Sequence, residues 1–204
     1  MPIRDPSLVL AQNGTKVIFF NLKKLIIVLV RDKIYQEIME KGWNEERQAF
    51  TQAYENDSLD AANLIMPLVF FMAPNDPKFL KTLRATAPNS CIKSGGLISN
   101  GLVMRYDNST TEDSLPGVEG SFNICTFWLI EALTRAGRHD PQMLDDARWK
   151  FEDMLSYANH VGLFAEQTST TGSQLGNFPQ AFSHLSLISA AFNLDRVLNE
   201  TKHL

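Results

Sequence analysis

Cysteine is scarce in this chain of 204 residues, where Cys91 and Cys125 are the two copies. Two cysteines make neither a disulfide framework nor a CxxC pair. We therefore expect both to be reduced thiols, with Cys125 buried in an apolar helix. Basic charge is also in short supply, because 19 Lys and Arg are set against 23 Asp and Glu, for a net charge of −4. Nucleic acid needs a basic stripe to bind its phosphates, so we do not expect it as a partner.

Motifs for metals and nucleotides are missing as well. The four histidines show neither HExxH nor another ligand spacing, so the sequence predicts no catalytic metal. Gly95-Gly96 lacks the glycine pattern of a phosphate-binding loop, and no GKS or GKT follows it. We expect no cofactor.

A long uninterrupted apolar run is also absent. The most apolar segment, Val17–Val30, is broken by Asn21, Lys23 and Lys24, whereas a membrane-spanning helix needs about 20 largely apolar residues. The segment is also a poor signal peptide, because Asp5 and no basic cluster precede it and no small-residue cleavage site follows. These features favour a cytoplasmic location.

Period-2 alternation is absent too, so almost no strand is expected beyond a short pairing around 102–106. The length favours one domain, and the apolar spacing is helical. Helix ends are marked by caps such as Asn75-Asp76-Pro77 and Asp140-Pro141, and by Gly42 after the first helix. The fold is therefore predicted to be all-α, with helices over 22–41, 61–72 (bent at Pro67), 77–86, 119–135, from 141 onward, and 178–199.

Two polar loops stand out between these helices. The first, 87–116, is rich in Gly, Ser, Asn and Asp, and loops of that length in a compact domain are usually functional or disordered. The second follows the apolar run Val161–Ala165 and begins with Glu166. A carboxylate held in a loop at the mouth of a cavity can serve as a general base; a lone loop glutamate is otherwise most often solvated.

The wording of these loops resembles the glucoamylase-like glycoside hydrolases, family 15, which also holds some trehalases. The resemblance rests on LV-x-RY at 102–106, LPG-x-EG-x-F at 115–122, C-[ST]-FWL-x-EAL from Cys125, and GLFAEQ ending at Gln167. Looser matches occur at Arg31-Asp32 and Asp60-Ala61. It covers roughly 31–198, so residues 1–30 are an atypical N-terminal segment and 31–204 are expected to be the C-terminal half of the family's catalytic domain.

The resemblance implies an inverting, exo-acting hydrolase of α-linked glucosides on an (α/α)6 toroid. It makes Glu166 the catalytic base that activates water and Arg105 a clamp on sugar hydroxyls. Tyr106 beside it could stack or hydrogen-bond, and Glu119 matches a glutamate common in the bacterial members. The substrate would be a starch-type or isomaltose-type oligosaccharide or trehalose; the sequence does not choose among them.

These residues also have purely structural interpretations. Arg105 could be a surface residue paired with Asp107, and Glu119 could be only a charge at a helix start. Phe127 and Trp128 are predicted to be core residues, because they lie in an apolar helix. His184 is predicted to be a packed, hydrogen-bonded residue rather than a catalytic one.

One departure from the family bears on activity. The family's general acid follows a tryptophan-glutamate pair, but Trp43, Trp128 and Trp149 precede Asn, Leu and Lys here. The chain also has room for about six of the twelve helices. We therefore expect a partial toroid with long loops on one face, whose isolated chain has little activity. The alternative is a non-catalytic half-domain that binds sugar or pairs with a missing N-terminal half; self-association is a further possibility.

Overall fold

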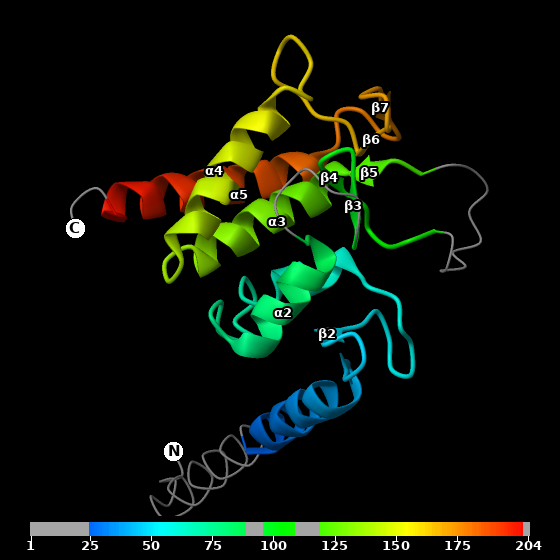
Figure 1. The fold of residues 1–204 in the computed structure, drawn as a ribbon, viewed down its shortest axis with the longest axis vertical. Coiled ribbons are helices and arrows are strands. Elements are labelled where there is room, and N and C mark those ends of the chain that lie inside the picture. The colour runs from blue at the N-terminus through cyan, green and yellow to red at the C-terminus, as the bar shows by residue number, and fades with distance from the viewer. Residues whose placement is uncertain (1–24, 89–95, 109–118, 202–204) are drawn as a thin grey trace, which may run out of the picture. The chain divides into compact units, whose positions relative to one another are not determined.

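The computed structural model describes residues 25–88, 96–108 and 119–201 (Figure 1). The chain divides into two units, Met1–Lys41 and Gly42–Leu204, and each is described by itself. Within the described ranges, no helix combines the length and apolar character needed to cross a membrane. Residues 17–24 of the apolar segment, Cys91, and residues 89–95 and 109–116 of the polar stretch 87–116 lie outside the described residues.

The first unit contains one described helix, over residues 25–41. Within the described residues it agrees with the predicted helix 22–41. In its last turn, Lys41 Nζ forms an ion pair of 3.0 Å with Oε1 of Glu37, four residues earlier. Eight large apolar side chains of this helix are between 40% and 67% exposed: Leu25, Ile26, Ile27, Val28, Leu29, Val30, Ile34 and Tyr35.

The second unit begins with small elements. The strands β1 (Trp43–Asn44) and β2 (Ala49–Phe50) form an antiparallel hairpin. The 3-10 helix η1 (Ala61–Ile65) and the helix α2 (Pro77–Thr86) follow. Asp76 caps α2 by accepting the amide of Lys78 at 2.8 Å, as the sequence predicted.

The predicted α-helix 61–72 is wrong. The chain makes η1 and then a series of turns, in which the amide of Met66 donates to Asn63 O at 3.3 Å and that of Leu68 to Ile65 O at 2.8 Å. Pro67 has no amide hydrogen to continue an i to i−4 ladder. Phe70 ends the turns at φ 58, outside the helical region.

A second hairpin joins β3 (Ile98–Ser99) to β4 (Leu102–Val103), in agreement with the predicted pairing near 102–106. Its turn is Asn100-Gly101, with φ of 51 and 77. Positive φ at both central residues is the type I′ geometry that an Asn-Gly pair favours. The amide of Val103 donates to Thr126 Oγ1 at 3.0 Å, which ties this hairpin to the next helix.

Three helices form the bundle of the second unit: α3 (Asn123–Ala136), α4 (Pro141–Leu155) and α5 (Ala181–Thr201). The helix α3 packs against both of the others. The predicted helix 119–135 starts too early, because β5 (Ser121–Phe122) first pairs with β6 (Gln167–Thr168). The strand β6 also pairs with β7 (Gln174–Leu175).

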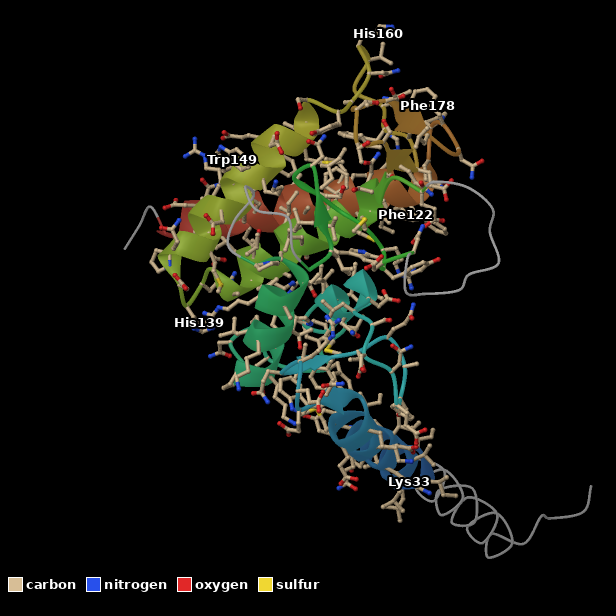
Figure 2. The ribbon with its side chains drawn as sticks, turned by 45° about the vertical axis from the view of Figure 1, so that its right-hand side comes forward. Lys33, Phe122, His139, Trp149, His160 and Phe178 are labelled. Atoms are coloured by element: carbon tan, nitrogen blue, oxygen red, sulfur yellow. The ribbon has the colours of Figure 1, made fainter. Side chains whose placement is uncertain are left out.

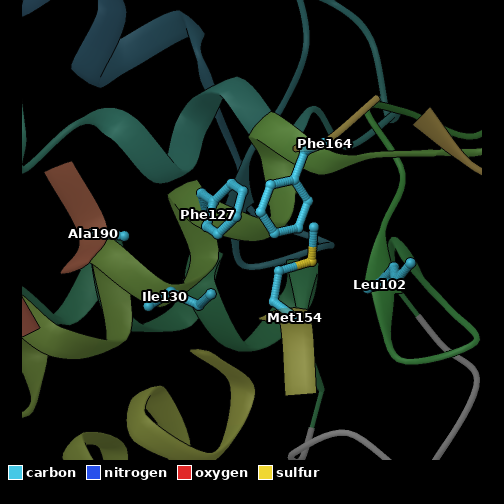
Figure 3. Packing of buried hydrophobic residues seen from close by; sticks show 6 residues of the cluster. All are labelled: Leu102, Phe127, Ile130, Met154, Phe164 and Ala190. Carbon is cyan, nitrogen blue, oxygen red and sulfur yellow. The ribbon is translucent and has the colours of Figure 1, made fainter. Parts of the chain in front are cut away.

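The core lies where the three helices meet (Figure 3). Its fully buried members are Leu102, Phe127, Ile130, Met154, Phe164 and Ala190. The rings of Phe127 and Phe164 meet edge to face, with centroids 5.4 Å apart, an arrangement that adds to the burial term. Phe127 is thus the core residue that was predicted, and the all-α class is confirmed.

Candidate functional site

Two loops that are far apart in the sequence meet at one end of the bundle. The pairing of β5 with β6 joins the segment before α3 to the loop that follows α4, and Figure 1 shows β5, β6 and β7 gathered at that end. Figure 2 places Phe122 and Phe178 at this end and His139 at the other. Glu166 lies directly before β6, inside this junction.

The backbone of Glu166 is held on both sides. Its amide donates to Asn177 O at 2.9 Å, and its carbonyl accepts the amide of Asn123 at 3.0 Å. The carboxylate is held as well, because Oε2 accepts the Asn177 amide at 3.1 Å and Asn177 Nδ2 at 2.9 Å. A Cβ at position 176 would lie 2.8 Å from Oε2, and Gly176 has φ 72, so both the available space and the backbone conformation favour glycine there.

Asn123 anchors this loop to the start of α3. It is buried, donates from Nδ2 to Ala165 O at 2.9 Å and accepts from Thr168 Oγ1 at 2.8 Å. Gln167, which matches the family's wording, accepts the amide of Gly120 at 2.9 Å. The residues on either side of Glu166 are therefore fixed by buried or backbone hydrogen bonds.

Arg105 is oriented by a carboxylate. Its Nε donates to Asp60 Oδ1 at 2.7 Å, and that oxygen also caps η1 by accepting the amide of Ala62 at 2.7 Å. The hydrogen bond to Asp60 raises the pKa of Arg105, so the guanidinium is charged. The bond uses one of its five donors. Cys125 is a buried free thiol close to this pair, and burial raises its pKa.

Arg105 and Glu166 line the same open pocket, whose volume is about 350 Å³. That size is within the range of small-ligand sites. The pocket combines one cation and one carboxylate with aromatic and aliphatic walls, the composition that suits a polyhydroxylated ring. Its full lining is Arg105, Phe122, Ile124, Trp128, Glu166, Gln180, Phe182 and Ser183.

Trp128 was predicted to be a core residue, but it is only partly buried and lines the pocket. The neighbouring Phe127 occupies the core position, since adjacent helical residues point about 100° apart. Trp128 therefore adds an aromatic surface to the site that periodicity alone did not reveal.

Tyr106 and Glu119 are not among the described residues that line this pocket. Glu119 accepts a hydrogen bond from Asn108 Nδ2 at 2.9 Å. It is not at a helix N-terminus as predicted, because α3 begins at Asn123. The strand pairing of β5 has displaced the helix start by four residues.

His184 uses both ring nitrogens. Nε2 accepts the amide of Phe164 at 3.2 Å, so the proton is on Nδ1, which donates to Gln180 O at 2.7 Å. Its ring also meets Phe164 edge to face. The prediction of a packed, hydrogen-bonded histidine is confirmed.

Several residues of the site were not predicted from the sequence to have a functional role. Asp60 was part of only a loose match to the family, and Asn123 and Asn177 belong to no recognised catalytic or binding motif. The signal that could have found Asn177 is its place after Leu175-Gly176, since a glycine beside a polar residue often allows close backbone approach.

Comparisons with known proteins agree with this description. The model for "Glycosyl hydrolases family 15" matches residues 23–192. The chain is 39% identical over 172 residues to the trehalase of Mycobacterium tuberculosis, covering 84% of this chain and 23% of that protein. It is 39% identical over 170 residues to the trehalase of Thermoplasma volcanium, covering 83% and 25%.

A more distant relative, trehalase 2 of Sulfolobus acidocaldarius, is 25% identical over 167 residues, covering 81% of this chain and 26% of the relative. The chain thus spans about a quarter of the length of these curated relatives. No solved structure matches it. Because the family model covers most of the chain, this protein belongs to glycosyl hydrolase family 15.

Proposed function

We propose that this chain carries half of an inverting glycoside hydrolase site for an α-linked glucoside, with trehalose as the first candidate and starch-type oligosaccharides as the second. The observation that carries the proposal is the pocket shared by Glu166 and Arg105. The names of the relatives, all trehalases, support the choice of substrate.

In this proposal Glu166 is the base. Water attacks the anomeric carbon, its oxygen forms the new bond, and the carboxylate takes the released proton as the glycosidic bond breaks. The leaving oxygen must receive a proton from an acid. Arg105, whose guanidinium is charged and oriented by Asp60, donates hydrogen bonds to sugar hydroxyls. Trp128 supplies an apolar surface for the ring.

The base can be tested without the acid by using α-glucosyl fluoride, whose fluoride leaves without protonation. We expect the purified chain to release glucose from the fluoride and very little from trehalose or maltotriose, because general acid catalysis contributes about 10²–10⁴-fold. Glu166→Gln should abolish fluoride hydrolysis, and Glu152→Gln, an exposed carboxylate paired with Arg148, should leave it unchanged.

The product gives a second reading of the mechanism. An inverting reaction releases β-glucose from the α-fluoride, which polarimetry or NMR detects within the first turnovers. Fluoride hydrolysis that persists in Glu166→Gln would overturn the assignment of the base. Robust turnover of trehalose by the isolated chain would show that an acid is present within it.

We also propose that a further polypeptide segment pairs with α5 and supplies this acid. Four large apolar side chains lie along α5 and are between 62% and 66% exposed: Phe182, Leu185, Ile188 and Phe192. A contiguous exposed apolar row on a folded domain indicates an interaction surface. Phe182 also lines the pocket, so a segment on this row would border the site.

The pairing can be tested with the part of the Thermoplasma volcanium trehalase that lies outside the matched region. We expect it to bind the chain and to restore trehalose hydrolysis, and Leu185→Gln with Phe192→Gln should prevent both effects. Binding that is unaffected by these two substitutions would exclude α5 as the interface.

A further inference from the structure

We propose that Asn177 is a positioning residue, which holds the Glu166 carboxylate by one oxygen and leaves the other to accept the proton of water. This inference rests on the proposed role of Glu166 as the base. Three hydrogen bonds join the two residues: Glu166 N–H to Asn177 O at 2.9 Å, and the Asn177 amide and Nδ2 to Glu166 Oε2 at 3.1 and 2.9 Å.

The two carboxylate oxygens of Glu166 differ in the hydrogen bonds that they accept. Oε2 accepts two donors from Asn177, whereas within the described residues Oε1 accepts no hydrogen bond. Two donors on a single oxygen fix the rotation of the carboxylate, and hydrogen bonds to an ionised acceptor are the stronger kind. Since Glu166 lines the pocket, its second oxygen retains the lone pairs that a base needs.

Asparagine fits this position better than a charged donor would. Its amide donates at every pH and adds no charge, so it orients the carboxylate without neutralising it as a lysine or arginine would. Gly176 makes the approach possible, because any side chain at that position would press against Oε2. Gly176 and Asn177 therefore both lie against the same oxygen atom, Oε2 of Glu166.

Kinetics with α-glucosyl fluoride test the functional side. We expect Asn177→Ala to lower kcat about tenfold, the low end for a charge-assisted hydrogen bond, because this one is exposed to solvent. KM should stay within about twofold, because the binding contacts remain. Asn177→Asp has the same shape but cannot donate, and its added charge should move the low-pH limb of the pH–rate profile to higher pH. Asn199→Ala, on the exposed side of α5, is the matched control.

Crystal structures of the wild-type chain and Asn177→Ala test the geometric side independently of activity. We expect the carboxylate to leave its place or to adopt two conformers in the variant, while the Glu166 N–H to Asn177 O bond persists. A carboxylate that stays in place overturns the proposal, as does an unchanged pH profile in Asn177→Asp. If the wild-type chain does not hydrolyse the fluoride, the proposed function fails, and the crystal structures alone decide whether Asn177 holds Glu166.

Discussion

Single residues determine where the charges of this protein lie. Glu131 is the most buried acid in the described part of the chain, at 1% exposure, within α3. Its Oε1 accepts hydrogen bonds from Arg135 at 2.9 Å and from Asn193 on α5 at 2.8 Å, whereas Oε2 is buried and has no partner. Burial is the main cause that raises the pKa of Glu131, and the contact with Arg135 opposes it.

This raised pKa predicts a pH dependence of stability. The folded state binds the proton of Glu131 more tightly than the unfolded state does, so the contribution is fully present below the ordinary pKa of 4.5. It is lost as the pH rises through the raised value. Wild type should therefore lose stability as the pH increases through this window, whereas Glu131→Gln has no such proton to lose. The free energy of unfolding of the variant minus that of wild type should rise accordingly.

Urea unfolding at a series of pH values measures this difference. Glu152→Gln is the control, because Glu152 is an exposed carboxylate paired with Arg148 on α4. Parallel pH profiles for wild type and Glu131→Gln would show that the folded state does not perturb Glu131.

Asp60 offers a second test at this scale. Asp60→Asn keeps an oxygen to cap η1 but loses the ion pair with Arg105. Since Arg105 is 39% exposed, solvent screening limits the loss to about 1 kcal/mol of unfolding free energy. On the proposed role of Arg105, the affinity for trehalose should fall as well, because the guanidinium is no longer oriented. The control is Asp57→Asn, in the exposed loop beside Asn44; equal sugar affinity in both variants would contradict this role for Asp60.

At the scale of elements, the junction between the start of α3 and β6 positions the site. Removing the Asn123 side chain leaves Thr168 Oγ1 without its acceptor in a buried place. We expect Asn123→Ala to lower the free energy of unfolding by about 2 kcal/mol, within the range for a buried unsatisfied group. Thermal unfolding measures it, with the exposed Asn199→Ala as control. A change below about 0.5 kcal/mol, typical of a surface substitution, would contradict the role of this junction.

The same scale shows what the sequence could predict. Caps such as Asp76-Pro77 and Asp140-Pro141 located α2 and α4, because a local hydrogen bond determines those helix starts. The start of α3 was missed, since it depends on the pairing of Ser121–Phe122 with a strand more than forty residues away. The resemblance of its loop predicted a role for Glu166, but the contact of Glu166 with Asn177 follows from the pairing of β6 with β7, which brings the residues flanking the two strands together.

At the scale of the whole molecule, two exposed apolar surfaces invite association: the row on α5 and the helix 25–41. We expect the chain to self-associate at micromolar concentrations, because exposed apolar surface of this extent is uncommon on monomers. Multi-angle light scattering should show a lower mass for the double variant Leu185→Gln with Phe192→Gln than for wild type. Leu194→Gln, on the buried face of the same helix, should instead lose several kcal/mol of stability. A wild-type chain that stays monomeric would contradict the prediction.

The contribution of the first unit can be separated by removing residues 1–41. Every described buried apolar side chain lies between Trp43 and Val197, so the second unit holds its own core. We therefore expect the truncated chain to unfold cooperatively, with a Tm within about 4 °C of the full chain, the shift that corresponds to about 1 kcal/mol or less. If light scattering shows that truncation lowers the number of copies in the assembly while the α5 variant does not, association runs through the helix 25–41 rather than α5. A truncated chain that loses its cooperative transition would show that the two units share a core.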